Sequence, residues 1–188
     1  MKTLGSFLLL IVLSLAAMPA HASDLTLYGG FQRQGAVTLD TGTTSQLGKA
    51  VTQTFDPTNF GVFGIRYGHG RVVGSEHTLA YTPNFIESAR KAILYNSNLI
   101  IQAPTPIVRP YGTVGVGAIL TMGDSVLNIG KKFAINYGGG LKILPAGPVG
   151  IRFDVRGYTI PSVQRSGSSI ESKTLNIAEV SVGVLFSK

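Results

Sequence analysis

Residues 149–158 alternate between two kinds of side chain. One alternate set is aliphatic or aromatic and the other is mostly charged. The apolar set is Val149, Ile151, Phe153 and Val155, and the other set is Arg152, Asp154, Arg156 and Tyr158. A repeat of two residues predicts a β-strand with two unlike faces. A soluble sheet would turn these charges to water, whereas a small membrane barrel would turn them inward and place the aliphatic residues against lipid.

Seven further segments carry the same two-residue repeat, so the pattern predicts eight strands. The predicted strands span residues 25–34, 59–67, 76–85, 92–102, 108–121, 132–144, 149–160 and 174–186. Most approach the roughly 9–11 residues that a tilted strand needs to cross a bilayer. The connections 35–58, 122–131 and 161–173 are long, whereas those between them are short and rich in Gly or Pro. Long loops on one side and short turns on the other are typical of outer-membrane barrels, whose long loops face outside.

The second face of each strand is too polar for a dry soluble core and too rich in glycine for an ordinary solvent face. Both properties suit the interior of a narrow eight-stranded barrel, which side chains fill. The charged residues predicted to share this lumen are Arg66, Arg109, Lys142, Arg152, Asp154, Arg156 and Glu179, with Glu76 as a further candidate. An unpaired buried ion costs several kcal/mol, so these charges must be paired. Cations outnumber acids in this set, and both a plugged interior and a thin anion-preferring water path stay open.

The N-terminus predicts export. Lys2 supplies a positive start, residues 7–17 are apolar, and residues 20–22 read Ala-His-Ala, so residues 1–22 are a predicted signal peptide and residues 23–188 the barrel domain. The chain has no cysteine, which in an exported protein favours bacteria. The formal net charge of +7 falls to +6 without Lys2, and the basic residues lie singly along strands. No nucleic-acid partner is therefore expected.

Three segments resemble the small outer-membrane β-barrel family of the OmpA and OmpX transmembrane-domain type. They are residues 110–118 (PYGTVGVGA), residues 133–142 followed by 149–158, and residues 181–186 (SVGVLF). The resemblance implies an all-β fold, an eight-stranded antiparallel up-and-down transmembrane β-barrel with long extracellular loops and short periplasmic turns. It also implies insertion by the barrel-assembly machinery, with Ser181, Gly183 and Phe186 matching the family's C-terminal assembly signal. Lys188 stands where that signal ends in an aromatic residue.

Candidate chemistry outside the lumen is sparse. Ser75 and His77 share one face of their strand and Glu76 does not, although outer-membrane enzymes that modify lipid A use Ser and His. No second motif supports catalysis, and His69 and His77 lack further metal ligands at suitable spacing. We therefore expect no enzyme activity, cofactor or metal. Without tryptophan, an aromatic girdle would have to come from Tyr28, Phe60, Phe63, Tyr67, Tyr81, Phe85, Tyr95 and Phe133.

The predicted role is structural, in envelope integrity, or surface binding through the extracellular loops, of which residues 35–58 form the longest. One alternative is a narrow pore for small or hydrophobic solutes, and a second is a soluble periplasmic ligand-binding barrel. The expected partners are outer-membrane lipid, lipopolysaccharide and, during insertion, the barrel-assembly machinery. The barrel is expected to be a monomer.

Overall fold

The computed structural model describes residues 23–35, 37–43, 50–55, 58–85, 90–122, 127–128, 130–145, 147–165 and 173–188. The predicted signal peptide, residues 1–22, lies outside the described residues. In this part of the chain, no helix is long and apolar enough to cross a membrane.

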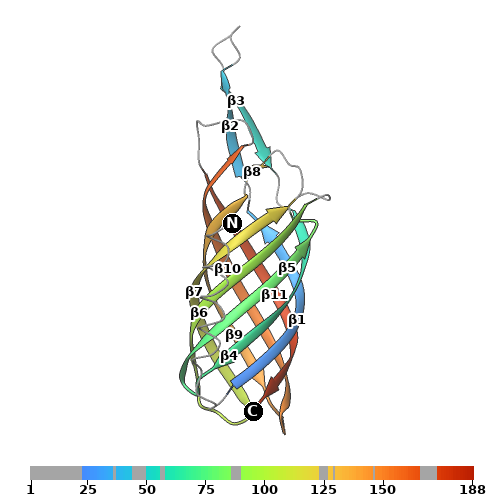
Figure 1. The fold of residues 1–188 in the computed structure, drawn as a ribbon, viewed down its shortest axis with the longest axis vertical. Coiled ribbons are helices and arrows are strands. Elements are labelled where there is room, and N and C mark those ends of the chain that lie inside the picture. The colour runs from blue at the N-terminus through green and yellow to red at the C-terminus, as the bar shows by residue number, and fades with distance from the viewer. Residues whose placement is uncertain are drawn as a thin grey trace, which may run out of the picture.

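Eight long antiparallel strands close into a barrel (Figure 1). They are β1 (Ser23–Gln34), β4 (Asn59–His69), β5 (Val73–Pro83), β6 (Lys91–Gln102), β7 (Val108–Met122), β9 (Lys131–Ile143), β10 (Val149–Arg165) and β11 (Lys173–Ser187). Each strand pairs with the next along the chain, and β11 pairs with both β10 and β1, which closes the sheet on itself. The two-residue repeat and the up-and-down order predicted from the sequence are therefore confirmed.

The structure adds detail at the long-loop end that the pattern did not predict. The segment between β1 and β4 contains a hairpin of β2 (Val37–Thr43) and β3 (Ala50–Phe55), which projects from the barrel in Figure 1. The short β8 (Leu127–Asn128) pairs with the end of β10. At the short-turn end, β5 begins three residues earlier than predicted, because Val73 to Ser75 pair with β6.

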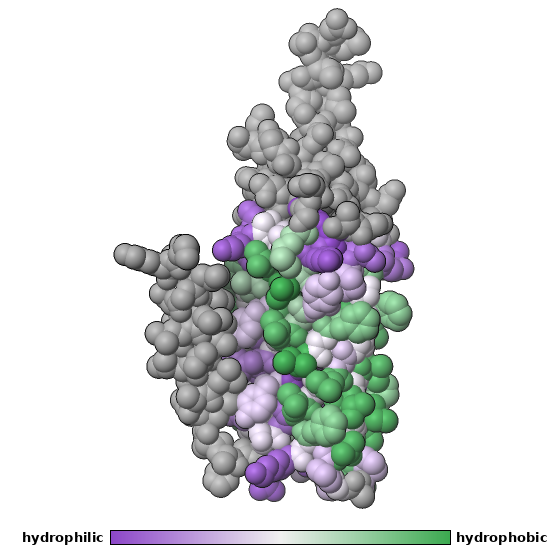
Figure 2. All heavy atoms as spheres, turned by 45° about the vertical axis from the view of Figure 1, so that its right-hand side comes forward, coloured by the Kyte–Doolittle hydropathy of each residue, from purple (hydrophilic) through white to green (hydrophobic). Residues whose placement is uncertain are grey.

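The outer wall of the barrel is apolar. Large aliphatic and aromatic side chains of every barrel strand point outward; Phe31, Phe63, Val155 and Val180 are each more than half exposed. Hydrophobic residues cover the centre and right of the visible wall in Figure 2, and hydrophilic residues gather at its upper end and at its lower edge. A continuous apolar belt of this kind is unfavourable in water and favourable in a bilayer.

The interior has two sections. The section near the short turns and the middle of the barrel contains the paired charges, whereas the section near the long loops contains a cluster of apolar residues. This apolar cluster comprises Tyr28, Phe60, Val62, Ala80, Phe85, Ala92, Leu94, Ile119, Ala134, Tyr158, Ile160, Leu175 and Ile177. The prediction that Tyr28, Phe60 and Phe85 belong to an external girdle is wrong, because all three side chains are buried inside the barrel.

Phe85 reaches the interior through a change in chain direction after β5. Asn84 has a positive φ of 57°, in the left-handed region that asparagine tolerates better than most residues. The amide of Phe85 then donates to the carbonyl of Arg90 at 2.8 Å. The Phe85 ring packs edge-on against Phe60, with ring centroids 5.2 Å apart. The turn thus places an aromatic ring across the upper end of the lumen.

Candidate functional site

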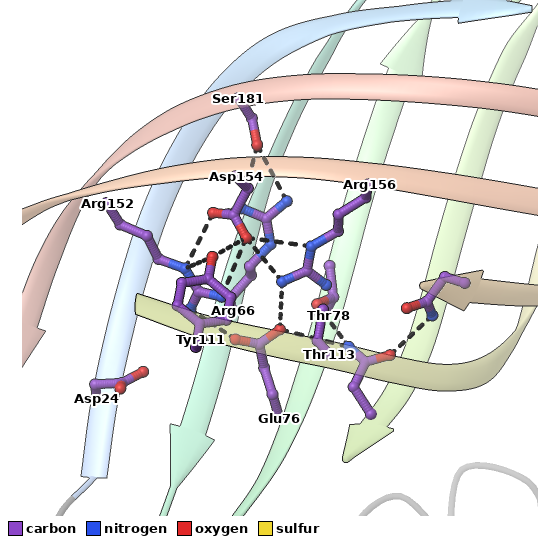
Figure 3. A network of polar contacts seen from close by, with 12 residues as sticks. Asp24, Arg66, Glu76, Thr78, Tyr111, Thr113, Arg152, Asp154, Arg156 and Ser181 are labelled. Carbon is purple, nitrogen blue, oxygen red and sulfur yellow. Dashed lines mark hydrogen bonds and ion pairs between the residues drawn. The ribbon is translucent and has the colours of Figure 1, made fainter. Parts of the chain in front are cut away.

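Six charged side chains meet inside the middle of the barrel, and Figure 3 labels five of them, all except Glu179. We call them the central network: Arg66, Glu76, Arg152, Asp154, Arg156 and Glu179. They come from β4, β5, β10 and β11, and all point inward because they occupy the inward positions of the two-residue repeat. Each is at most 2% exposed. Three arginines face three carboxylates, so the network is formally neutral.

Arg66 links two acids that lie on different strands. Its Nη1 donates to Asp154 Oδ2 at 2.8 Å, and its Nη2 donates to Glu179 Oε1 at 2.6 Å. The hydroxyl of Ser181 lies 3.2 Å from Nη2. The guanidinium also stacks on the ring of Tyr28, with Cζ 3.6 Å from the ring centroid. These contacts connect β4 to β10 and β11 across the lumen.

Glu76 and Asp154 are shared by the two arginines of β10. Glu76 Oε1 accepts from Arg156 Nη2 at 2.6 Å, and Glu76 Oε2 forms an ion pair with Arg152 Nη1 at 2.6 Å. Asp154 lies between the same two arginines, with Arg152 Nε at 3.0 Å and Arg156 Nη2 at 2.9 Å. Charge-assisted hydrogen bonds of this kind are about twice as strong as neutral ones. The low dielectric inside the barrel strengthens them further and makes any unpaired member costly.

Neutral polar groups complete the coordination of the acids. The hydroxyl of Tyr111 donates to Asp154 Oδ1 and accepts from Arg152 Nε at 2.9 Å. Glu179 Oε2 accepts from Gln32 Nε2 at 2.7 Å and from the Tyr158 hydroxyl at 3.2 Å.

A second ion pair lies below the central network, toward the short turns. Lys142 Nζ donates to Asp24 Oδ2 at 2.5 Å and to Gln102 Oε1 at 2.8 Å. Lys142 was among the predicted lumen residues, whereas Asp24 was not, because its position next to the predicted cleavage site gave no hint of an inward role.

The structure does not bring Arg109 into the network. Arg109 shares the inward positions of β7 with Tyr111, but it lies at the end of the strand, and its Nε donates to the carbonyl of Thr105 at 2.8 Å in an exposed turn. The predicted excess of cations disappears as a result: Arg109 leaves the set, and Glu76 and Asp24 join it. The two-residue repeat gives the face of a side chain, but it does not give its height along the barrel.

Glycines make room for the long side chains. A Cβ on Gly138 would lie 2.8 Å from Arg156 Cα and 3.1 Å from its Cγ, and a Cβ on Gly140 would lie 2.6 Å from the Tyr111 hydroxyl. Both glycines face the interior on β9, beside the charged side chains of β10. This explains why the polar face of the sequence is also rich in glycine.

The arrangement fills the cross-section of the barrel. Arg66 and Arg152 are fully buried, and Arg156 is 1% exposed. A water-filled channel would expose these side chains. A cavity of about 710 Å³ opens at the short-turn end and is lined by residues including Asp24, Gln102 and Arg109. At the other end, the space among the apolar cluster holds about 10 Å³, roughly the minimum for one water molecule.

Ser75 and His77, the two residues considered for catalysis, lie on the outer wall. Ser75 and His77 point outward, and Glu76 points into the lumen. Ser75 Oγ contacts the ring of His69 at 3.1 Å, whereas His77 Nδ1 contacts the Tyr95 hydroxyl at 2.9 Å. Ser75 and His77 thus bond to different partners. Among the described residues, no group of three or more His, Cys, Asp or Glu is placed to hold a metal ion.

The three residues of the predicted assembly signal occupy different environments on β11. Ser181 points inward and its hydroxyl lies 3.3 Å from Glu179 Oε1, whereas Phe186 points outward and is 43% exposed. A Cβ on Gly183 would lie 2.6 Å from the carbonyl oxygen of Leu27, so only glycine fits there without a shift. Whether these residues act as a signal stays a prediction.

The fold is that of known outer-membrane barrels. Neisserial surface protein A (NspA) superposes with a TM-score of 0.60 at 14% identity, over 88% of this chain and 96% of that one. OprG from Pseudomonas aeruginosa superposes with a TM-score of 0.54 at 12% identity, over 89% of this chain and 97% of that one. At such identities the likeness concerns the fold alone. No curated protein sequence matches the chain.

The sequence itself matches a family model along nearly its whole length. Residues 7–186 match the outer membrane protein beta-barrel domain. The closed antiparallel barrel, the apolar outer wall and the charged lumen agree with this match. The chain therefore belongs to the outer membrane protein beta-barrel domain family.

Proposed function

We propose that this protein is a closed, non-conducting and non-enzymatic barrel of the outer membrane that supports the envelope and presents its long loops at the cell surface. The observation that carries the proposal is the central network, because six buried and mutually paired charges occupy the lumen where a pore would need water. The apolar cluster above it adds a second obstruction. A solute would have to break charge-assisted hydrogen bonds that are costly to leave unmade.

The outer wall supports the membrane location over a soluble periplasmic barrel. A soluble ligand-binding barrel would turn its apolar face inward around the ligand and its charged face to water. Here the charged residues are buried and the large aliphatic side chains are exposed.

The surface role falls to the loops. The hairpin of β2 and β3 extends the barrel wall away from the membrane and is the longest structured projection among the described loops. Replacement of residues 37–55 by a short Gly–Ser linker should leave the heat-dependent gel mobility of the barrel unchanged. If the hairpin is the contact surface, retention of expressing cells on surfaces coated with serum proteins or glycans should fall.

Conductance across planar bilayers tests the closed lumen. The refolded wild-type barrel should give no steady unitary current steps. A folded triple variant, Arg66→Ala and Arg156→Ala with Phe85→Ala, should give small ones because the network and the apolar cluster above it are both partly removed. The heat-dependent mobility shift verifies folding of both proteins. Steady steps from the wild type would favour the narrow-pore alternative.

A test of catalysis is also direct. Cells that express the wild type or a Ser75→Ala, His77→Ala variant should show the same lipid A and phospholipid profile by mass spectrometry. A lipid change that depends on these two residues would replace the structural role with an enzymatic one.

A further inference from the structure

The outer wall changes character along one row of residues near the long-loop end. In this row Arg33, Ala178, Gly157 and Tyr137 stand side by side on β1, β11, β10 and β9. The next outward positions toward the long loops are polar on β10 and β11, where the side chains of Thr159 and Asn176 are hydrogen-bonded at 3.0 Å, whereas β9 has Ile135. The next outward positions toward the middle of the barrel are Phe31, Val180 and Val155, which are apolar, and Gly139 on β9. On β10 and β11 the wall therefore changes from apolar to polar across this row, as it does where the acyl chains of a bilayer meet the headgroups.

Two small residues make this row a trough. Ala178 and Gly157 form its floor, Arg33 stands at one end, and the Tyr137 ring lies against Gly157, where an added Cβ would be 2.8 Å from it. The trough has a volume of about 360 Å³. Backbone and side-chain polar groups of Gly35 and Asn176 also border it.

An apolar groove continues from the trough toward the middle of the membrane. It has a volume of about 570 Å³ and is lined by Phe31, Phe63, Phe153 and Val180, with Gly29 and Gly61 leaving its floor low. Phe31 is the next outward residue after Arg33 on β1, and Val180 is the next after Ala178 on β11. The trough and the groove thus adjoin along the pairing of β1 with β11.

Charge on the outer wall favours an anionic occupant. Arg33 is exposed and has no acid beside it on the wall, since every acid whose side chain the structure describes (Asp24, Glu76, Asp154, Glu179) points into the barrel. Arginine binds phosphate through two parallel hydrogen bonds, and a cation at the headgroup level attracts anionic lipid.

We propose that the trough beside Arg33 is a binding site for lipid A, the phosphorylated glycolipid of the outer leaflet. A sugar phosphate would bind to the Arg33 guanidinium, the sugar would lie over Ala178 beside the Tyr137 ring that covers Gly157, and one acyl chain would occupy the groove below. The inference rests on the long loops facing outside, and it is independent of whether the lumen conducts. Aromatic faces such as that of Tyr137 suit the apolar face of a sugar ring.

Native mass spectrometry of the folded barrel in detergent tests the site. The probes are diphosphoryl lipid A, its dephosphorylated form, phosphatidylglycerol and inorganic phosphate. Arg33→Gln should weaken binding of diphosphoryl lipid A by roughly tenfold, the effect of losing one charge-assisted contact, and should hardly change binding of the dephosphorylated form. Ala178→Leu, which fills the floor of the trough, should weaken both forms.

Lys91→Gln is the matched control, because Lys91 is an exposed cation at the long-loop end of β6 and borders neither the trough nor the groove. It should change lipid A binding by less than about twofold. Equal losses in Arg33→Gln and Lys91→Gln would overturn the proposal in favour of diffuse electrostatic attraction. The proposal would also be overturned if phosphatidylglycerol bound with the same affinity as diphosphoryl lipid A and lost as much affinity in Arg33→Gln. Displacement of lipid A by millimolar inorganic phosphate would overturn it as well.

Discussion

The two sections of the barrel interior fill the same narrow space by different means. In the charged section, a few long side chains from four strands are held by directional hydrogen bonds, and removal of one leaves its partners unpaired. In the apolar section, aliphatic and aromatic side chains pack mainly through contact area, and the Tyr158 hydroxyl, which donates to Glu179, joins the two sections. The charged section should therefore fail cooperatively when one member is lost, whereas the apolar section should lose stability in proportion to the volume removed.

Substitution of Arg66 should have the largest effect. Arg66→Ala leaves Asp154 and Glu179 without a cation that contacts both, and breaking a buried ion pair by removing one partner costs about 3–5 kcal/mol. Urea-induced unfolding of the barrel in lipid vesicles measures the loss. Arg66→Lys keeps the charge but cannot reach both acids, so its stability should fall between that of the wild type and that of Arg66→Ala. A loss below about 1 kcal/mol for Arg66→Ala would mean that water enters and solvates the acids.

Phe85→Ala should come next, with a loss of about 3 kcal/mol. The Phe85 ring is buried against Phe60, and its removal leaves a cavity at the upper end of the lumen. The same unfolding assay applies, and Phe85→Leu should recover most of the stability because the apolar section depends on volume. If Phe85→Leu and Phe85→Ala are equally destabilised, the ring has a specific role that packing does not explain.

Tyr111→Phe should have an intermediate effect of about 1–2 kcal/mol. It removes a hydroxyl that donates to Asp154 and accepts from Arg152. The ring stays in place, with its centroid 4.6 Å from Arg152 Cζ. A double-mutant cycle with Thr113→Val, a buried neighbour on β7 that bonds to the Leu99 carbonyl, should show little coupling, because the two hydroxyls share no partner. Strong coupling would indicate a network that reaches further than the contacts described above.

Arg109→Ala should have the smallest effect, below about 0.5 kcal/mol. Its one hydrogen bond, to the Thr105 carbonyl, lies in an exposed turn. The comparison with Arg66→Ala is informative because the sequence places both arginines on the inward face of a strand. A large loss at Arg109 would show that the side chain turns into the lumen in the membrane.

Most of the fold could be predicted from the sequence, because the two-residue repeat and the turn residues act locally. The inward direction of Arg152, Asp154 and Arg156 follows from the same repeat. The pairing of Arg66 with Asp154 and Glu179 could not be predicted, since it depends on the tilt of the strands and on the relative height of residues far apart in the chain. Asp24 was missed because it lies next to the predicted cleavage site, before the start of the predicted strand.

The apolar section did leave a signal in the sequence. Ile160 shares the inward positions of β10 with Arg156, and Ile177 shares those of β11 with Glu179. At this end the inward positions of both strands are apolar, which indicates an interior that changes from charged to apolar along the barrel axis. Phe85 is different, because its inward position depends on the left-handed conformation of Asn84, which the alternation of residues does not reveal.

The central claim, that the charged section closes the lumen to water, is tested most directly by the reactivity of single cysteines. The chain has no cysteine of its own, so Thr78→Cys, in the buried layer of the central network, and Thr105→Cys, in an exposed turn, each carry a unique thiol. With a small water-soluble methanethiosulfonate reagent and the folded barrel in detergent micelles, Thr78→Cys should react more slowly than Thr105→Cys by more than about a hundredfold, because reaction requires local opening. Similar rates at the two positions would contradict the account and show a lumen filled with water.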